Sequence, residues 1–223
     1  MSRFCVIGSS STVAKHVISS LVKMPVYDVV KVGRDEDDHI KININHSNFM
    51  SEVDNIPLDL DYYLIALGYL IPKRMCEQSK VEVLDSVTIN LLFSVLLCEK
   101  ILDVNKSARI LLLGSESGQK GSYDTSYFVS KAGLSQYVKE KHVKFPSQQI
   151  VMVSPSLIED TKMTQERQDL DEVLKQANSL PKKRYLMASE VAELILFLLL
   201  SDKGYINNEV IEMNGGKFAR MRW

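Results

Sequence analysis

The sequence has few cysteines, no long hydrophobic run and no excess of either charge. Its three cysteines, Cys5, Cys76 and Cys98, form an odd count without metal-ligand spacing, which favours a reducing compartment. The longest apolar run, residues 194–200, is far shorter than the roughly 20 residues that span a bilayer, so no membrane association is expected. An apolar strand begins close to Met1 and leaves no room for a signal peptide. We therefore expect a cytoplasmic protein.

The charges nearly cancel, with 27 Lys and Arg against 28 Asp and Glu. Nucleic-acid binding usually needs a strongly basic surface, so nucleic acid is not an expected partner. The short basic cluster at residues 181–184 is interpreted as a solvated loop. With 45% hydrophobic and 25% charged residues, the composition is that of a globular protein and does not indicate disorder. The length of 223 residues fits one domain, because single α/β domains commonly reach about 200–250 residues.

Strand and helix patterns alternate along the whole chain without a repeat or a linker. This alternation predicts one α/β domain over residues 1–223, with a doubly wound, Rossmann-like parallel sheet of about seven strands. The predicted strands cover residues 3–8, 27–32, 40–44, 61–68, 108–113, 149–153 and 208–213. The first of the main predicted helices ends near residue 22, and the others cover residues 80–104, about 125–143 and 189–201. The second and third strands lie too close together for a helix, so their connection is predicted to be short.

The first strand ends in a glycine, and a polar turn leads into a helix. Strand, glycine turn and helix N-terminus form the first unit of a dinucleotide-binding fold. The free N–H groups and the dipole of such a helix attract a pyrophosphate, and hydroxyl groups in the turn add donors. The candidate contacts are Gly8, Ser9, Ser10, Ser11, Thr12 and Val13. A plain strand–turn–helix connection explains this segment equally well.

Residues 110–133 carry the strongest candidate for chemistry. An apolar strand ends at Gly114 and Ser115, and the helix after it carries Tyr127 and Lys131. Side chains four residues apart on a helix share one face, with Cβ atoms about 5–6 Å apart. A phenol beside an ammonium group is a proton donor whose ionised form is stabilised by the positive charge. Ser115, at the strand end, is positioned to reach the same spot, so the pattern predicts a proton-transfer site.

This block resembles the active site of the short-chain dehydrogenase/reductase family. In that family a serine at the end of the fifth strand precedes a Tyr-x-x-x-Lys helix, as Ser115 precedes Tyr127 and Lys131, with one residue fewer between them than usual. Gly118 matches the family's Ser-x-x-Gly pattern. The C-terminal segments E-V-A-E and V-I-E-x-x-G-G also resemble the family, and the resemblance covers about residues 3–217.

The resemblance implies an NAD(P)(H)-dependent oxidoreductase that interconverts a small-molecule carbonyl and its alcohol by hydride transfer. Tyr127 would be the general acid, and Lys131 would lower the tyrosine pKa and hold the nicotinamide ribose. Ser115 would hydrogen-bond the developing alkoxide, and Asn90 would hold a water in the proton relay. From the residues alone, a solvent-facing or self-capping Asn90 is equally open, because a short amide is a mediocre helix former.

The resemblance also implies a cofactor site. Asn43 matches a residue that contacts adenine, whereas Pro155 and Thr161 match residues near the nicotinamide carboxamide. No acidic residue ends the second strand, where one would bind the ribose 2′-hydroxyl of NAD. Arg34 at that point can pair with the 2′-phosphate of NADP, so NADP(H) is favoured over NAD(H). The alternative is a surface ion pair between Arg34 and Asp35 or Glu36.

The comparison with the family gives three further expectations. Residues 156–186 correspond to a short substrate lid. The helices over residues 80–104 and 125–143 correspond to the interface of a homodimer or homotetramer. Thr12 and Ala14 replace the second and third glycines of the family's loop, and Thr12 can restrict the approach of the phosphates. The alternative function is therefore a non-catalytic dinucleotide-binding sensor or scaffold.

Overall fold

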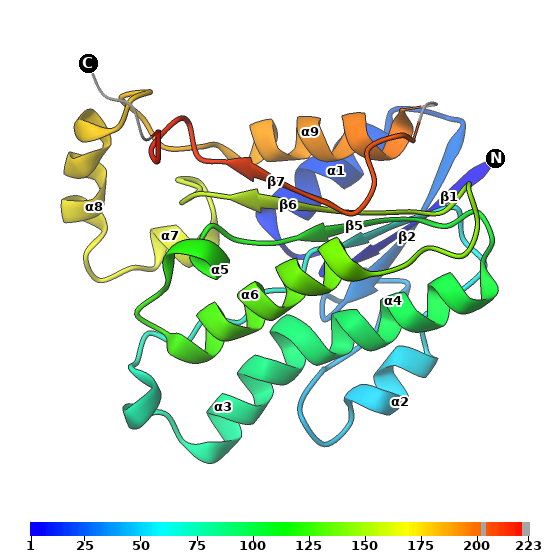
Figure 1. Cartoon of the computed structure of the whole chain (residues 1–223), viewed down its shortest axis with the longest axis horizontal. Coiled ribbons are helices and arrows are strands. Elements are labelled where there is room, and N and C mark those ends of the chain that lie inside the picture. Colours follow the sequence, from blue (N-terminus) through cyan, green and yellow to red (C-terminus); the bar gives the residue numbers. More distant parts are fainter. Residues whose placement is uncertain (202–203, 220–223) are drawn as a thin grey trace.

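The computed structural model, which describes residues 1–201 and 204–219, contains one sheet of seven parallel strands in the order β3-β2-β1-β4-β5-β6-β7 (Figure 1). The strands are β1 Ser2–Ile7, β2 Tyr27–Gly33, β3 Ile40–Lys41, β4 Tyr62–Ile65, β5 Arg109–Leu113, β6 Gln149–Pro155 and β7 Glu209–Met213. Strand order reverses between β1 and β4, as in a doubly wound fold. The predicted fold class is confirmed.

Helices cover both faces of this sheet (Figure 1). One face packs against α1 Thr12–Val22 and α9 Ala188–Leu200, and the other against α2 Phe49–Asp54, α4 Phe93–Val104 and α6 Thr125–Glu140. Within β5, Ile110 and Leu112 enter one hydrophobic core and Leu111 enters the other. Strands buried on both faces lack polar alternation, which explains the unbroken apolar pattern of this segment.

Short helices gather at the end of the sheet where the strands terminate (Figure 1). They are α5 Ser117–Lys120, α7 Lys162–Gln165 and α8 Leu170–Gln176, with single 3₁₀ turns at Met75–Glu77 and Ala177–Ser179. Helix α5 lies in a segment that the sequence predicts as a loop. Helices α7 and α8 fall within the predicted lid.

The segment after β2 differs from prediction in its details. The connection to β3 is short and has no helix, as expected. The predicted strand over residues 40–44, however, keeps only Ile40–Lys41, because the chain then turns: Asn48 Nδ2 donates to the Asn43 carbonyl at 2.8 Å, and Asn45 N–H donates to Asn48 Oδ1 at 2.8 Å. Helix α2 comes after this turn and was not predicted.

The long helix predicted over residues 80–104 is interrupted. It consists of α3 Lys80–Val87, a π turn at Thr88–Leu92 and α4. Lys80–Val104 is also a helix that is long and apolar enough to cross a membrane, with 39% of its most apolar 18-residue window buried. Length and composition alone are weak evidence of a span. Here the helix packs against α2, α6 and the sheet.

Candidate active site

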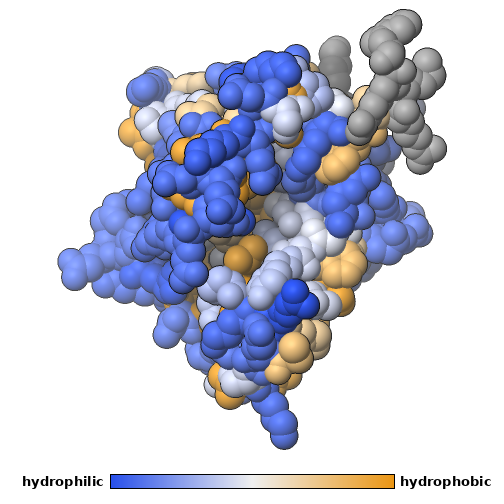
Figure 2. Space-filling model, turned by 90° about the vertical axis from the view of Figure 1, so that its left-hand side faces the viewer, coloured by the Kyte–Doolittle hydropathy of each residue, from blue (hydrophilic) through white to orange (hydrophobic). Residues whose placement is uncertain are grey.

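The candidate site lies where the parallel strands end. Figure 2 views this end of the molecule and shows a hollow with a hydrophobic patch in its floor, bordered by hydrophilic residues on its left and by residues of intermediate hydropathy on its right. In doubly wound sheets, ligands bind outside the carboxyl ends of the strands, next to the point where strand order reverses. Gly8 follows β1, Gly68 lies beyond β4 and Ser115 lies beyond β5, so all three lie at this edge.

Ser115 and Tyr127 are brought together: the serine hydroxyl lies beside the phenol and acts to lower its pKa. The tyrosine is only 6% exposed. Ser115 Oγ also accepts a hydrogen bond from the Ser117 N–H at 3.2 Å, which orients the hydroxyl. Gly118 permits this arrangement, because a Cβ there would lie 2.9 Å from the backbone carbon of Lys131. The glycine therefore lets α5 pack directly on the helix that carries the tyrosine.

Lys131 lies behind the tyrosine and is almost fully buried. Its ammonium group donates to the carbonyl oxygens of Leu67 at 2.9 Å and Leu113 at 3.1 Å, and lies 5.7 Å from the Tyr127 ring centroid. Burial lowers the pKa of Lys131 to about 8. These contacts hold the amine between the ends of β4 and β5.

The pKa of Tyr127 is raised, not lowered. Burial is the largest cause, the hydrogen bond from Ser115 opposes it, and the charge of Asp124 adds to the rise. The sequence predicts a lowering by the neighbouring ammonium. The difference arises because the ammonium of Lys131 donates to two carbonyl groups and lies over the ring.

Asn90 is fully buried within the π turn, so the solvent-facing alternative is wrong. Its side chain pairs with the backbone of Tyr69 in both directions: Oδ1 accepts from the N–H at 2.9 Å, and Nδ2 donates to the carbonyl at 2.7 Å. Nδ2 also donates to the Ser86 carbonyl at 2.9 Å. The side chain therefore fixes the segment beyond β4 to the helix, and its expected role in holding a relay water stays a prediction.

Asp124 is a buried residue that the sequence patterns did not single out. It caps helix α6, where its Oδ1 accepts from the Tyr127 N–H at 3.1 Å and from Ser126 Oγ at 2.7 Å. An aspartate immediately before a helix is a common N-cap, so this signal was present in the sequence. Its further partners lie on a distant segment, which no local pattern reveals.

The turn after β1 fits a pyrophosphate. Gly8 has φ +82°, and a Cβ there would lie 2.6 Å from the Ala66 carbonyl oxygen. Ser11 is the N-cap residue of helix α1, but its side chain makes no hydrogen bond to the first turn of the helix. The N–H groups of Thr12 and Val13 are therefore not capped by this side chain. Ser10 is exposed beside them. A helix N-terminus of this kind attracts an anionic group.

Ser9 is not available to the same ligand. It is buried, and its Oγ donates to Asp38 Oδ1 at 2.6 Å. The other oxygen of Asp38 accepts from the Asp35 N–H at 2.8 Å. Asp38, another residue that the sequence patterns did not single out, therefore shapes the loop after β2. A Cβ at Gly33 would lie 2.5 Å from Ser9 Oγ, so only glycine fits beside this pair.

Arg34 is exposed on that loop. Within residues 1–201 and 204–219 it makes no ion pair with Asp35 or Glu36, and its expected pairing with a 2′-phosphate stays a prediction. Asn43, the predicted adenine contact, is also exposed. Both side chains remain free for a ligand at this end of the site.

The predicted nicotinamide contacts lie at the end of β6 and in the lid. Pro155 is the buried last residue of β6. Thr161 Oγ1 donates to the Ile158 carbonyl at 3.1 Å and contacts Thr164 Oγ1 at 3.2 Å. Met163, two residues later, lies beside Gly68, since a methyl group at Gly68 would lie 3.7 Å from its Cε. The predicted lid therefore approaches the segment that follows β4.

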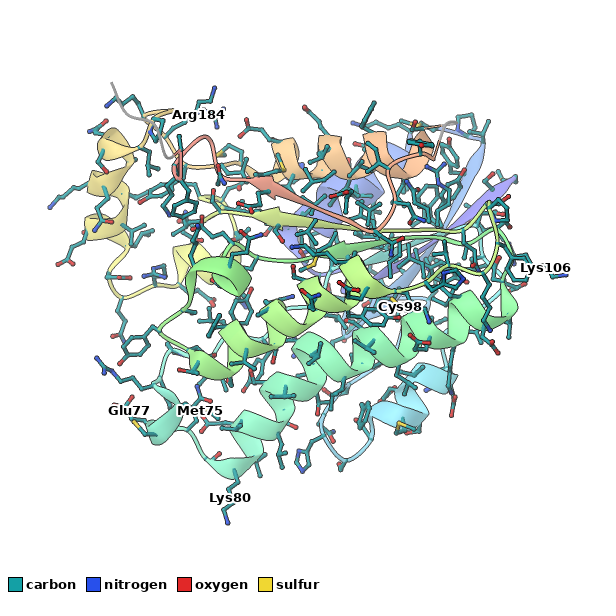
Figure 3. All side chains as sticks on the ribbon, in the orientation of Figure 1. Met75, Glu77, Lys80, Cys98, Lys106 and Arg184 are labelled. Atoms are coloured by element: carbon teal, nitrogen blue, oxygen red, sulfur yellow. The ribbon has the colours of Figure 1, made fainter. Side chains whose placement is uncertain are left out.

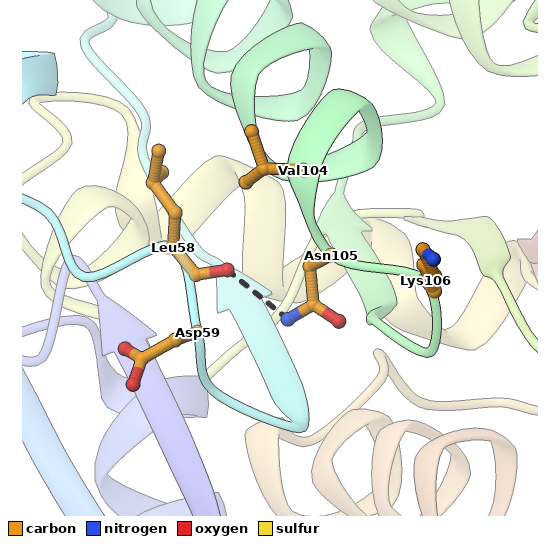
Figure 4. Close-up of a pocket in the computed structure, with 5 residues that line it drawn as sticks. All are labelled: Leu58, Asp59, Val104, Asn105 and Lys106. Carbon is orange, nitrogen blue, oxygen red and sulfur yellow. Dashed lines mark hydrogen bonds between the residues drawn. The ribbon is translucent and has the colours of Figure 1, made fainter.

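A separate depression lies at the opposite end of the sheet (Figure 4). It is lined by Leu58, Asp59, Val104, Asn105 and Lys106. Asn105 Nδ2 donates to the Leu58 carbonyl at 3.1 Å within it. Figure 3 labels Lys106 at the end of the molecule opposite Glu77 and Arg184. This depression is not part of the candidate site.

Comparison with known proteins places this geometry in a family. A family model described as enoyl-(acyl carrier protein) reductase matches residues 44–217. The chain belongs to the short-chain dehydrogenase/reductase family. The match supports an oxidoreductase with a Rossmann-type NAD(P)-binding fold.

Curated relatives of this dehydrogenase/reductase include 3-oxoacyl-[acyl-carrier-protein] reductases. The protein of Buchnera aphidicola subsp. Baizongia pistaciae is 31% identical over 117 residues, which are 51% of this chain and 47% of that protein. That of Aggregatibacter actinomycetemcomitans is 34% identical over 114 residues, 50% of this chain and 46% of that protein. The matched region thus spans about half the length of these relatives.

Solved structures confirm the fold along nearly the whole chain. A short-chain dehydrogenase family protein from Francisella tularensis has a TM-score of 0.82 at 22% identity, covering 99% of this chain and 100% of that one. A 4-hydroxyisoleucine dehydrogenase complexed with NADH has a TM-score of 0.81 at 18% identity, covering 99% of this chain and 100% of that one. At these identities the likeness concerns the fold alone.

Proposed function

We propose that this short-chain dehydrogenase/reductase is an active NAD(P)(H)-dependent oxidoreductase that reduces a small-molecule carbonyl to an alcohol, or catalyses the reverse reaction. The observation that carries the proposal is that the Ser115 hydroxyl and the Lys131 ammonium both lie beside the buried Tyr127 side chain. Buried cysteines Cys5 and Cys98 are free thiols, which suits a reducing compartment such as the cytoplasm.

The proposed roles follow from the contacts. A bound NAD(P)H supplies a hydride to the carbonyl carbon. Tyr127 donates its phenolic proton to the carbonyl oxygen, and Ser115 hydrogen-bonds that oxygen as negative charge develops. Lys131, held by two carbonyl groups, keeps one N–H that would bind the nicotinamide ribose. Asn90 holds the backbone beyond β4 in place and, by family resemblance, the relay water.

We propose that the cofactor is NADP(H) in preference to NAD(H). Gly8, Ser10, Ser11, Thr12 and Val13 would receive the pyrophosphate at the uncapped start of α1. Arg34 supports the preference because it is exposed and in no ion pair among the described residues, so a bidentate contact with a 2′-phosphate needs no ion pair to break. Asn43 would contact the adenine, and Pro155 and Thr161 the nicotinamide carboxamide.

We also propose a homodimer or homotetramer formed through the helices of residues 80–104 and 125–143. Four apolar side chains on these helices are 41–53% exposed: Val81, Leu84, Leu92 and Val129. The apolar helix that could pass for a membrane span is only partly covered by its own domain. A partner copy would bury the rest. Leu92→Glu should then shift the mass measured by light scattering to that of a monomer.

The alternative is a dinucleotide-binding sensor or scaffold without turnover. Thr12 and Ala14 in the glycine loop favour it. Both functions include cofactor binding, but only the oxidoreductase transfers a hydride from the bound cofactor to a substrate. A single set of binding and turnover measurements therefore separates them.

The test is calorimetric titration with NADPH and, separately, NADH, for the wild type and for Arg34→Ala. We expect NADPH to bind more tightly and the variant to lose that preference. NADPH oxidation is then measured with a 3-oxoacyl thioester, the substrate type of the curated relatives, and with simple ketones. Tyr127→Phe should lower kcat by about 10²–10⁴-fold without loss of NADPH binding, while the exposed Tyr205→Phe should not. Binding of neither nucleotide would refute the proposal, and binding with no dependence on Tyr127 would support the sensor.

A further inference from the structure

Ser9 and Asp38 join the turn after β1 to the loop after β2. Ser9 Oγ donates to Asp38 Oδ1 at 2.6 Å. On the other side of the carboxylate, Oδ2 accepts from the Asp35 N–H at 2.8 Å, and the Asp38 N–H donates to the Asp35 carbonyl at 3.2 Å. Ser9 and Asp38 are only 4% and 8% exposed. These two residues, with the bond between their side chains, are called the Ser9–Asp38 clamp below.

Arg34 lies between two points of the backbone that are held in place. Before it, Gly33 is the last residue of β2, and its carbonyl accepts from the Ile42 N–H at 2.8 Å. After it, the Asp35 N–H is held by the carboxylate of the clamp. The Arg34 side chain itself is exposed. The backbone that carries the guanidinium is therefore fixed relative to the turn after β1.

The turn after β1 has anchors of its own, which do not depend on the clamp. The N–H groups of Gly8 and Ser9 donate to the Val32 carbonyl at 2.9 Å and 3.3 Å, and the Ser11 N–H donates to the Gly8 carbonyl at 3.0 Å. All three bonds are made by the backbone and remain when the Ser9 hydroxyl is removed. Loss of the clamp should therefore free the Arg34 loop and leave the turn after β1 in place.

The charges of this loop act against a 2′-phosphate. Residues 35–38 are all acidic, and within them Asp37 pairs with Lys31. Like charges repel, so by charge alone the removal of any of these carboxylates should strengthen the binding of a 2′-phosphate. A change that weakens this binding without altering any charge must therefore act through the position of Arg34.

We propose that Ser9 and Asp38 are positioning residues for cofactor recognition, because their clamp holds Arg34 at a fixed place relative to the turn that receives the pyrophosphate. The inference rests on the proposed function for its consequence in NADPH binding. The 2′-phosphate and the pyrophosphate are parts of one molecule, so the groups that bind them must keep one spacing. A loop that is ordered before the ligand arrives avoids the entropic cost of ordering on binding. NADH lacks the 2′-phosphate and gains little from this order.

The test measures NADPH and NADH affinity by calorimetry for the wild type, Ser9→Ala and Glu36→Gln, after circular dichroism has shown that each protein is folded. Ser9→Ala removes the clamp bond and keeps every charge, whereas Glu36→Gln removes one charge from an exposed position of the same loop and keeps the clamp. We expect Ser9→Ala to weaken NADPH binding about tenfold and NADH binding by no more than about twofold. Glu36→Gln should leave NADPH binding unchanged or strengthen it by up to about threefold.

A double variant separates positioning from a general structural effect. Within the described residues no hydrogen bond joins Ser9 directly to Arg34, so the clamp is the expected route by which one affects the other. In the Arg34→Ala background, Ser9→Ala should change NADPH affinity by less than about twofold, because the guanidinium that the clamp positions is gone. Additive losses in the double variant, or equal losses of NADPH and NADH affinity in Ser9→Ala, would overturn the inference.

Amide exchange in the nucleotide-free protein tests the clamp apart from the proposed function. Ser9→Ala should speed exchange of the Asp35 N–H at least about threefold, because Asp38 loses its bond to the turn, whereas Glu36→Gln should not. Unchanged exchange in Ser9→Ala would also refute the inference. If the wild type binds neither nucleotide, the proposed function fails, and the exchange rates alone decide whether the clamp holds the loop. If Ser9→Ala does not fold, Asp38→Ala takes its place, because it removes the same bond, and Glu36→Gln then accounts for the lost charge.

Discussion

The side-chain amide of Asn90 and the backbone of Tyr69 form a reciprocal pair of hydrogen bonds, 2.9 Å and 2.7 Å long. This pair fastens the residue just beyond Gly68 to a π turn in the middle of a long helix. π turns often occur at functional sites, because the extra residue presents groups that a regular helix would bond internally. Here that turn lets a buried amide support the edge of the candidate site.

Replacing Asn90 by alanine should lower the free energy of unfolding by about 2–4 kcal/mol. The substitution leaves the Tyr69 backbone groups without their partner and opens a small polar cavity, and each buried group left unpaired costs about 1–3 kcal/mol. Urea unfolding monitored by circular dichroism measures the change. Asn178→Ala is the matched control, because that side chain is exposed and should alter stability by less than about 0.5 kcal/mol. Equal effects of the two substitutions would contradict the role given to Asn90.

The buried ammonium of Lys131 should make stability rise with pH in the alkaline range. Its pKa in the folded protein is about 8, below the ordinary value of 10.5. Between these values the unfolded chain binds a proton that the folded protein has released, so the free energy of unfolding increases with pH. The full contribution is at most about 3 kcal/mol, reached near the upper value. Below pH 8 both states are protonated and the contribution is absent.

Other groups lower the stability of the protein as pH rises, so the measurement must separate their effect from that of Lys131. Burial raises the pKa of Cys5 to about 12 and also raises that of Tyr127, so both lower stability at high pH. The difference between the wild type and Lys131→Met removes their effect, since both proteins contain them. That difference should grow in favour of the wild type from about pH 8 to about 10.5, whereas Lys139→Met, on the exposed side of the same helix, should give a constant difference. If the stabilities of the wild type and Lys131→Met changed with pH in parallel, the pKa of Lys131 would be that of an ordinary lysine.

The ion pair between Lys217 and Glu116 should matter more than its surface counterparts. Lys217 Nζ lies 3.0 Å from Glu116 Oε1, and the other oxygen, Oε2, is buried without a partner among the described residues. Lys217→Met leaves the carboxylate uncompensated and should cost about 1–3 kcal/mol of stability. Adding Glu116→Gln should restore most of the loss. Lys162→Met is the control, because its pair with Glu166 is exposed and 3.6 Å long, and should cost less than about 0.5 kcal/mol. Equal losses of stability in Lys217→Met and Lys162→Met would show that removing the ion-pair partner of Glu116 has no particular cost.

Local patterns in the sequence predict much of this architecture. Strands such as β5 are apolar on both faces, and the spacing of Tyr127 and Lys131 on one helix places both side chains at one site. The pattern could not predict the direction of the Tyr127 pKa, because this depends on where the ammonium of Lys131 finds acceptors. Those acceptors, the carbonyl groups of Leu67 and Leu113, lie on two other strand ends.

The features that the sequence did not reveal share one physical cause. Asp124, Asp38 and the partners of Asn90 act through hydrogen bonds between segments that are distant along the chain, as in the bond from Gln78 to Asp124. Helix α2 and the early end of β3 depend on side-chain bonds to the backbone within a turn. Propensity and periodicity describe local preference only, so contacts of these kinds stay hidden until the chain is folded.

Two glycines with positive φ provide the sharpest test of the site's geometry. Gly8 has φ +82° and faces the Ala66 carbonyl, while Gly121 has φ +88° and would place its Cβ in open space. Gly121, whose ψ is 168°, lies in a backbone region that is essentially restricted to glycine, so Gly121→Ala meets only a backbone penalty, about 1–3 kcal/mol. Gly8→Ala adds an overlap with the backbone of the strand end beside it, which should raise the loss to about 2–5 kcal/mol.

The same pair of variants separates stability from cofactor binding. Because Gly8 lies at the end of β1, next to the helix α1 N-terminus where the pyrophosphate is proposed to bind, its alanine variant should lose NADPH affinity at least about tenfold even under conditions where it is fully folded. Gly121→Ala, on the loop before α6, should bind NADPH with unchanged affinity. Calorimetry on both folded variants, with urea unfolding in parallel, measures the two effects separately. Unchanged NADPH affinity in Gly8→Ala would mean that the pyrophosphate does not approach the chain at this turn.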